Sequence, residues 1–172
     1  MKRIVLLPKK FNERIDNLVG LQEEVNGILF YQPQNEFCPI ESIFLTGIGN
    51  SGHVSSSSDR IKIANIFLKN NNSYNFVKFH THSLGTIKKF GEFYSYNFSK
   101  EDIESYKEQL KYDTNFIGMV ATPKIKLLYG LDNLSIRIVN GFPYKADLKI
   151  NNELNNIAKA EGFNLEKLIG SI

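Results

Sequence analysis

Two of the three histidines in this sequence lie in the segment Phe79-His80-Thr81-His82. Branched and aromatic residues precede them, so the segment 75–81 is predicted to be a strand. Side chains two residues apart on a strand project from the same face, so His80 and His82 would point together and could bind one metal ion. The spacing also fits a second interpretation, in which one imidazole is hydrogen-bonded in the core and the other is exposed.

A third potential ligand follows in Ser99-Lys100-Glu101-Asp102. A serine with an acid three residues later is also the pattern of a capping box at a helix start. The two roles are compatible, because the first turn of a helix can hold Asp102 toward the end of a strand. Hydrolytic zinc sites commonly have three protein ligands and an open position for water, and His80, His82 and Asp102 would supply those three. Zinc lowers the pKa of that water from ~15.7 toward ~7, and a nearby carboxylate must still collect the proton.

These residues, in this order, resemble the JAMM (MPN+) metalloproteases, which include deubiquitinases and related isopeptidases. Members of that family have a glutamate in an E-x-x-G-x-L segment, then H-x-H-P, then S-x-x-D. Here the corresponding segments are Glu24-Val25-Asn26-Gly27-Ile28-Leu29, His80-Thr81-His82-Ser83 and Ser99-Lys100-Glu101-Asp102. The resemblance extends from about residue 24 to the strand near residue 120.

The resemblance implies a role for each residue. His80, His82 and Asp102 would be the ligands of a Zn²⁺ ion, Glu24 the general acid and base, and Ser99 a hydrogen-bond donor to the oxyanion. It implies hydrolysis of peptide or isopeptide bonds, with a ubiquitin-like protein or its conjugate as substrate. It also implies an MPN-type α/β domain, layered like the cytidine deaminases.

The sequence departs from the family pattern at two places, and one further acid competes for the role of Glu24. The usual proline is Ser83 here, which removes no ligand. The segment 83–98 is longer than the family spacing and is expected to form an extended loop, which loop-closure entropy tolerates. This loop is expected either to cover the metal as a lid or to pack onto the domain. Glu23 is a rival to Glu24, but Glu24 keeps the spacing to Gly27, and neighbouring residues on a strand face opposite ways.

Two other functions remain open at this stage. MPN domains that have lost metal ligands serve as non-catalytic assembly modules, although a scaffold has no physical need for paired histidines beside a carboxylate. The net charge of +3 leaves a nucleic-acid-associated metal-binding domain as a weaker alternative, since no dense basic cluster is present. His53 is expected to be solvated in a serine-rich loop, and Cys38 to be a small buried hydrophobe.

Periodicity and turn residues predict the elements that would position this site. Mixed strands and helices in this order indicate an α/β domain with a mixed central sheet covered by helices. Helices are expected at 11–21, at 61–68 with Ser58 and Asp59 as caps, at 99–112 and, as a C-terminal tail, at 152–168. Strands are expected at 1–8, 25–31, 42–46, 75–81, 116–121, 124–129 and 134–139.

The amino-acid composition limits the number of domains, the kinds of metal site and the cellular location that can be expected. The 172 residues are predicted to form a single domain, with 42% hydrophobic and 23% charged residues, near the globular norm. One cysteine excludes an internal disulfide and multi-cysteine metal sites, and suits a reducing compartment. A cytoplasmic location is therefore expected. No apolar stretch approaches the ~20 residues that span a bilayer, so membrane insertion is not expected, whereas peripheral association stays open. The sequence indicates no oligomeric state.

Overall fold

The structure, a computed structural model, describes residues 2–165. Its centre is a seven-stranded sheet with strand order β6-β5-β4-β2-β3-β1-β7. The strands are β1 (Lys2–Pro8), β2 (Val25–Tyr31), β3 (Phe37–Ile48), β4 (Asn75–Thr81), β5 (Ile117–Ala121), β6 (Lys126–Tyr129) and β7 (Asn133–Val139). The helices are α1 (Lys9–Val19), α2 (Ser58–Asn70), α3 (Leu84–Phe90), α4 (Glu92–Ser95), α5 (Lys100–Tyr112) and α6 (Tyr144–Ala160).

The sheet is mixed. β2 is antiparallel to both β3 and β4, β4 is parallel to β5, and β5 is antiparallel to β6. The long strand β3 pairs with β1 near its start and with β2 along the rest of its length, so one strand joins the two parts of the sheet. Every residue of β2 is buried, as expected for a central strand covered on both faces.

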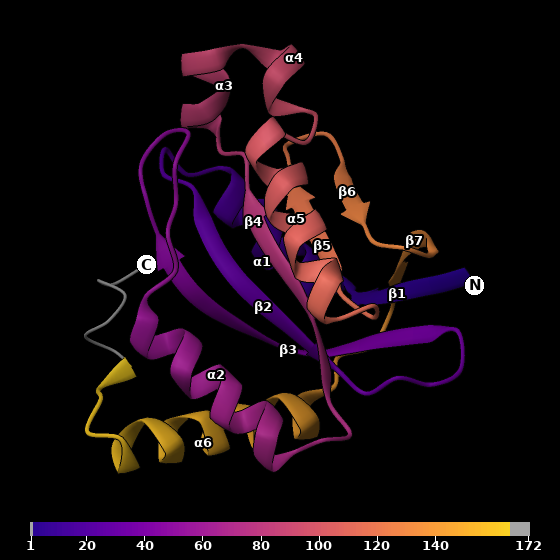
Figure 1. Cartoon of the computed structure of the whole chain (residues 1–172), viewed down its shortest axis with the longest axis vertical. Helices are drawn as coiled ribbons and strands as arrows, with labels where there is room; N and C mark the ends of the chain where they lie inside the picture. The colour runs from indigo at the N-terminus through magenta and orange to yellow at the C-terminus, as the bar shows by residue number, and fades with distance from the viewer. Residues whose placement is uncertain (1, 166–172) are drawn as a thin grey trace.

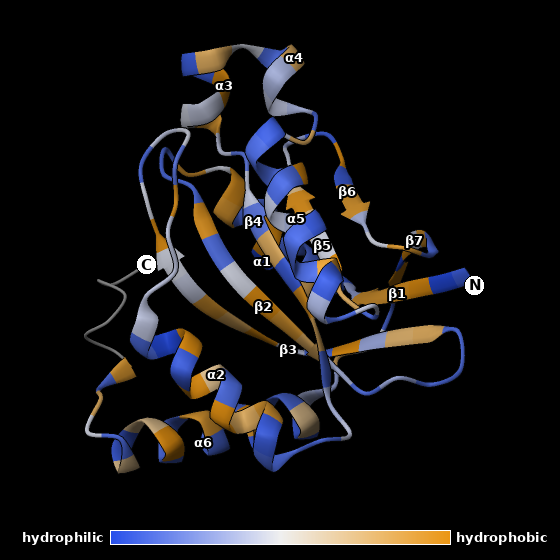
Figure 2. Ribbon diagram, in the orientation of Figure 1, coloured by the Kyte–Doolittle hydropathy of each residue, from blue (hydrophilic) through white to orange (hydrophobic). Residues whose placement is uncertain are grey.

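Helices cover both faces of the sheet (Figure 1). On one face α1 packs Phe11, Ile15 and Leu18 into the largest core cluster. On the opposite face α2 and α6 form a second cluster around Phe30 of β2. Here α5 packs Tyr106 onto β5 in a third cluster. Hydrophobic colour is concentrated on the strands in Figure 2, whereas α5 is hydrophilic along most of its length. The site described below lies on the face that α5 covers.

Most predicted elements are confirmed. The strands predicted at 25–31 and 75–81 match β2 and β4 residue for residue, and the strand predicted at 42–46 lies within β3. The helix predicted at 99–112 is α5, with Ser99 as its N-cap. The α/β class with a mixed sheet and covering helices is also confirmed. No helix among residues 2–165 is long and apolar enough to cross a bilayer.

Three predictions need correction. The segment 83–98 is not an extended loop but contains α3 and α4, because Ser83 caps α3 by accepting a hydrogen bond from the Thr86 amide. The cap of α2 is Ser57 rather than Ser58 or Asp59. The C-terminal helix predicted at 152–168 begins eight residues earlier, directly after Pro143, and ends before Gly162, whose φ of +77° is left-handed. Residues 166–168 of that prediction lie outside the described residues.

Candidate metal centre

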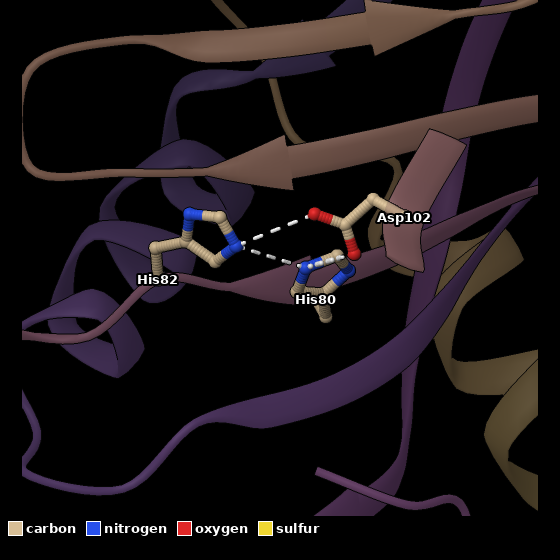
Figure 3. Close-up of side chains that lie close together, drawn as sticks. All are labelled: His80, His82 and Asp102. Atoms are coloured by element: carbon tan, nitrogen blue, oxygen red, sulfur yellow. Dashed lines mark hydrogen bonds and ion pairs between the residues drawn. The ribbon is translucent and has the colours of Figure 1, made fainter. Parts of the chain in front are cut away.

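The two histidines and the aspartate come together where β4 ends and α5 begins (Figure 3). His80 is the penultimate residue of β4, and His82 is the first residue after the strand ends. Asp102 lies in the first turn of α5. Strand geometry directs both imidazoles to one face, as the sequence predicted. The capping box of α5 fixes Asp102, because the Ser99 amide donates to its Oδ2 at 2.8 Å.

The potential ligand atoms of these three side chains lie close together. Nε2 of His80 and Nε2 of His82 are 3.3 Å apart. The first is 3.1 Å from Oδ1 of Asp102 and the second is 3.5 Å from Oδ2. Atoms bound ~2.0–2.1 Å from a tetrahedral zinc are separated from one another by about 3.3–3.4 Å. The distance between the two Nε2 atoms matches this value. One ligand atom from each of the three residues lies within 4.8 Å of the others, so the three side chains could bind one zinc ion.

Hydrogen bonds on the far side of each imidazole assign the ring protons. Nδ1 of His82 lies 2.9 Å from the carbonyl oxygen of Ser95, an acceptor, so Nδ1 donates. Nδ1 of His80 lies 3.3 Å from the hydroxyl of Tyr106, whose own proton goes to the Met119 carbonyl at 3.4 Å. A hydroxyl that donates to Met119 can accept from Nδ1 of His80. With Nδ1 protonated in both rings, loss of the Nε2 proton leaves a lone pair facing the cluster, as metal ligation requires.

The cluster is strongly coupled electrostatically. Burial by itself would raise the pKa of the Asp102 carboxyl, but hydrogen bonds from His80 and His82 and from the Ser99 amide hold that pKa well below its usual range. Burial opposes protonation of His82, yet its contacts with Asp102 and Ser95 raise the pKa of the ring overall. A divalent cation would take the place of the shared protons, since it satisfies the carboxylate and both lone pairs at once.

Glu24 lies in the same cleft as the cluster, immediately before β2. Its side chain is only 5% exposed, and its Oε1 accepts a hydrogen bond of 2.7 Å from the Thr86 hydroxyl. Its other oxygen, Oε2, is left for a further proton. The rival Glu23 is exposed and does not line the cleft. Of the two acids, the fold therefore places Glu24 beside the three potential ligands.

Ser99 also lines the cleft. Its hydroxyl oxygen accepts from the Asp102 amide at 3.0 Å, which uses a lone pair and leaves the hydroxyl hydrogen for another acceptor. Capping and a donor role are thus compatible in this geometry. His53 is exposed in its loop, as predicted, and borders the cleft without joining the group of ligand atoms. Cys38 is buried and free, also as predicted.

The cleft has a volume of about 440 Å³. One wall is formed by α3 and α4, which contribute Thr86, Phe90 and Tyr94. Phe90 packs against Gly52, where a Cβ atom would lie 2.1 Å from the phenyl ring and where φ is +91°. Only glycine fits that contact, so the inserted helices are held closely against the loop opposite.

Sequence reasoning missed the residues that support the site. Thr86 holds the Glu24 carboxylate and the carbonyl of Ser95 orients His82, and both lie in the inserted segment. Tyr106 orients His80, but its helical spacing signalled only a core position. Lys78 lines the cleft beside the cluster, and burial lowers the pKa of its ammonium group. Its position two residues before His80 on the strand was the available signal.

Comparison with solved structures finds a similar architecture. The solution structure of protein DSY2949 from Desulfitobacterium hafniense, a structural genomics target, superposes with a TM-score of 0.52. The match covers 83% of this chain and 97% of that one, with 18% sequence identity. This likeness concerns the fold alone. No protein-family model and no curated protein matches the sequence.

Proposed function

We propose that this chain is a zinc-dependent hydrolase of peptide or isopeptide bonds, of the JAMM type, which processes or removes a ubiquitin-like modifier. The single observation that carries the proposal is the convergence of His80, His82 and Asp102, with one ligand atom of each within 4.8 Å of the others, in one cleft with the buried carboxylate of Glu24. The MPN type of the fold is part of the same proposal.

In the proposed reaction Glu24 and Ser99 act beside the bound metal. Bound zinc supplies Lewis acidity, which activates a water molecule and polarises the scissile carbonyl. Glu24 takes the proton of the attacking water on the oxygen that Thr86 does not occupy, and delivers it to the leaving amine. Ser99 donates its free hydroxyl hydrogen to the developing oxyanion, a contribution that in other enzymes is worth several kcal/mol.

The N-terminal cap of α5 supports these roles for Ser99 and Asp102. α5 caps itself with Ser99 and Asp102, so the residue that would stabilise the oxyanion and the residue that would bind the metal are fixed by the same two hydrogen bonds. Such rigid support is what a catalytic group requires in order to act without reorganisation. A non-catalytic scaffold would need neither the imidazole orientation nor the buried acid.

The test compares Glu24→Gln with Glu23→Gln. Both variants are loaded with zinc, their metal content is measured, and turnover is followed on a panel of ubiquitin-like proteins joined at their C-termini to a fluorogenic amine. Glu24→Gln should bind zinc like the wild type and lose at least about 10²-fold in turnover, because an amide cannot accept the proton. Glu23→Gln should retain turnover. Full activity of Glu24→Gln contradicts the proposed role, and a zinc-loaded wild type inactive on the whole panel favours the scaffold.

A further inference from the structure

A lysine without a partner lies beside the candidate metal centre. Lys78 is two residues before His80 on β4, so its side chain leaves the sheet on the same face, and both residues line the same cleft. Lys78 is partly buried, and among residues 2–165 its ammonium group forms no ion pair and no hydrogen bond. By contrast, Lys89 donates to the Ser51 carbonyl and Lys124 pairs with Glu92.

The acids of the cleft are already engaged. Asp102 faces the two histidines and Glu24 accepts from Thr86. Together these two carboxylates would balance the charge of a divalent cation bound there, which would leave the charge of Lys78 without a counter-charge in the cleft. Glu101 also lines the cleft, but it is exposed at the start of α5 and forms no ion pair with Lys78. Removing a lysine from water without a partner costs free energy, which an anionic ligand would offset.

We propose that Lys78 binds a carboxylate of the substrate close to the scissile bond. The inference rests on the proposed hydrolase function and names the substrate class of that site. The Cα atoms of Lys78 and His80 are about 6.6 Å apart along the strand, within reach of a lysine side chain. The carboxylate of a C-terminal residue lies two covalent bonds from its amide nitrogen. A terminal carboxylate on the leaving residue, or an acidic side chain beside the bond, would therefore reach Lys78.

The consequence is a preference that a general amidase would lack. A conjugate whose leaving group is an α-amino acid with a free carboxylate can form an ion pair with the ammonium group of Lys78. A leaving amine without a neighbouring carboxylate leaves the ammonium group desolvated and unpaired. Lys78 would thus be a specificity-determining residue, separate from the proposed metal ligands and from Glu24.

Binding to the metal-free protein tests this inference independently of catalysis. The probes are acetyl-Gly-Gly-Gly with a free C-terminus, the same peptide with a C-terminal amide, and acetyl-Gly-Glu-Gly-amide, titrated by NMR. Wild-type protein is compared with Lys78→Met, which keeps the length without the charge, and with Lys78→Arg, which keeps the charge. Lys88→Met, at an exposed position on α3 outside the cleft, is the matched control.

The wild type and Lys88→Met should bind at least one carboxylate peptide about tenfold more tightly than the neutral amide, as expected for a charge-assisted hydrogen bond. Lys78→Met should lose that preference and Lys78→Arg should retain it. Which carboxylate peptide is preferred identifies a terminal or a side-chain source. No preference in the wild type, or an equal preference in Lys78→Met, overturns the inference. Zinc content, measured in parallel on Lys78→Met and wild type, reports separately on the proposed function.

Discussion

Tyr106→Phe should weaken zinc binding without disturbing the fold. The Tyr106 ring is 2% exposed and packs between Phe98, Phe116 and Tyr129, contacts that phenylalanine retains. The substitution removes only the hydroxyl that accepts from Nδ1 of His80. Burial raises the pKa of Tyr106, so this hydroxyl stays neutral and can hold the imidazole in its metal-binding tautomer.

The expected size of the effect follows from the geometry. Loss of an outer hydrogen bond to a metal-binding histidine typically lowers metal affinity about 10–100-fold. The contact of the Tyr106 hydroxyl with Nδ1 of His80 is 3.3 Å, longer than the ~2.9–3.0 Å typical of N–H···O bonds. Its contact with the Met119 carbonyl is 3.4 Å, longer than the ~2.7–2.8 Å typical of O–H···O bonds, so the lower end applies. A tenfold loss corresponds to about 1.4 kcal/mol of binding free energy. The free energy of unfolding of the metal-free protein should fall by about 1 kcal/mol.

The assay is competition for zinc with a chromophoric chelator. The matched control is Tyr129→Phe, which deletes a hydroxyl from the same aromatic cluster but does not contact His80. Zinc affinity should fall about tenfold in Tyr106→Phe and stay at the wild-type value in the control. The reasoning fails if Tyr106→Phe binds zinc as tightly as the wild type, or if both variants lose affinity equally.

Three further substitutions test the supports of the site. Thr86→Val removes the hydroxyl that donates to Glu24 and should lower turnover about tenfold with unchanged zinc content. If the variant turns over substrate as fast as the wild type, Thr86 does not position Glu24. Gly118→Ala places a Cβ atom 2.7 Å from the Tyr106 ring. It should lower the free energy of unfolding, measured by urea denaturation, by about 1–3 kcal/mol and should weaken zinc binding. If stability and zinc affinity both stay at the wild-type values, the Tyr106 ring is not held as described. Ser83→Ala removes the cap of α3 and should cost about 1 kcal/mol in the same denaturation, whereas an unaltered midpoint would argue against the cap.

Local sequence signals were sufficient where the physics is local. Branched and aromatic residues in the segment 75–81 and the capping pattern at Ser99 predicted both elements that bring His80, His82 and Asp102 together. The distance of 3.3 Å between the two Nε2 atoms is the outcome that the strand geometry indicated. The spacing to Gly27 also selected the acid that faces the cleft, Glu24.

Long-range contacts were not predictable in the same way. The inserted segment was expected to be a loop because it is longer than the family spacing between His82 and Ser99, yet Ser83 caps a helix there. Gly85 lies against the Gln22 carbonyl, where a Cβ atom would be 2.0 Å away, a close contact that spacing along the chain cannot reveal. The carbonyl of Ser95, which orients His82, is a backbone atom and therefore carries no sequence signal at all.

The proposed function requires that one zinc ion binds to the imidazoles of His80 and His82 and the carboxylate of Asp102. Its most direct test is the amount of tightly bound zinc per chain, determined by elemental analysis after reconstitution and removal of free metal. One zinc ion per chain is expected in the wild type and close to none in the double variant His80→Ala, His82→Ala. A wild type that retains no zinc, or a double variant that retains as much as the wild type, would contradict the claim.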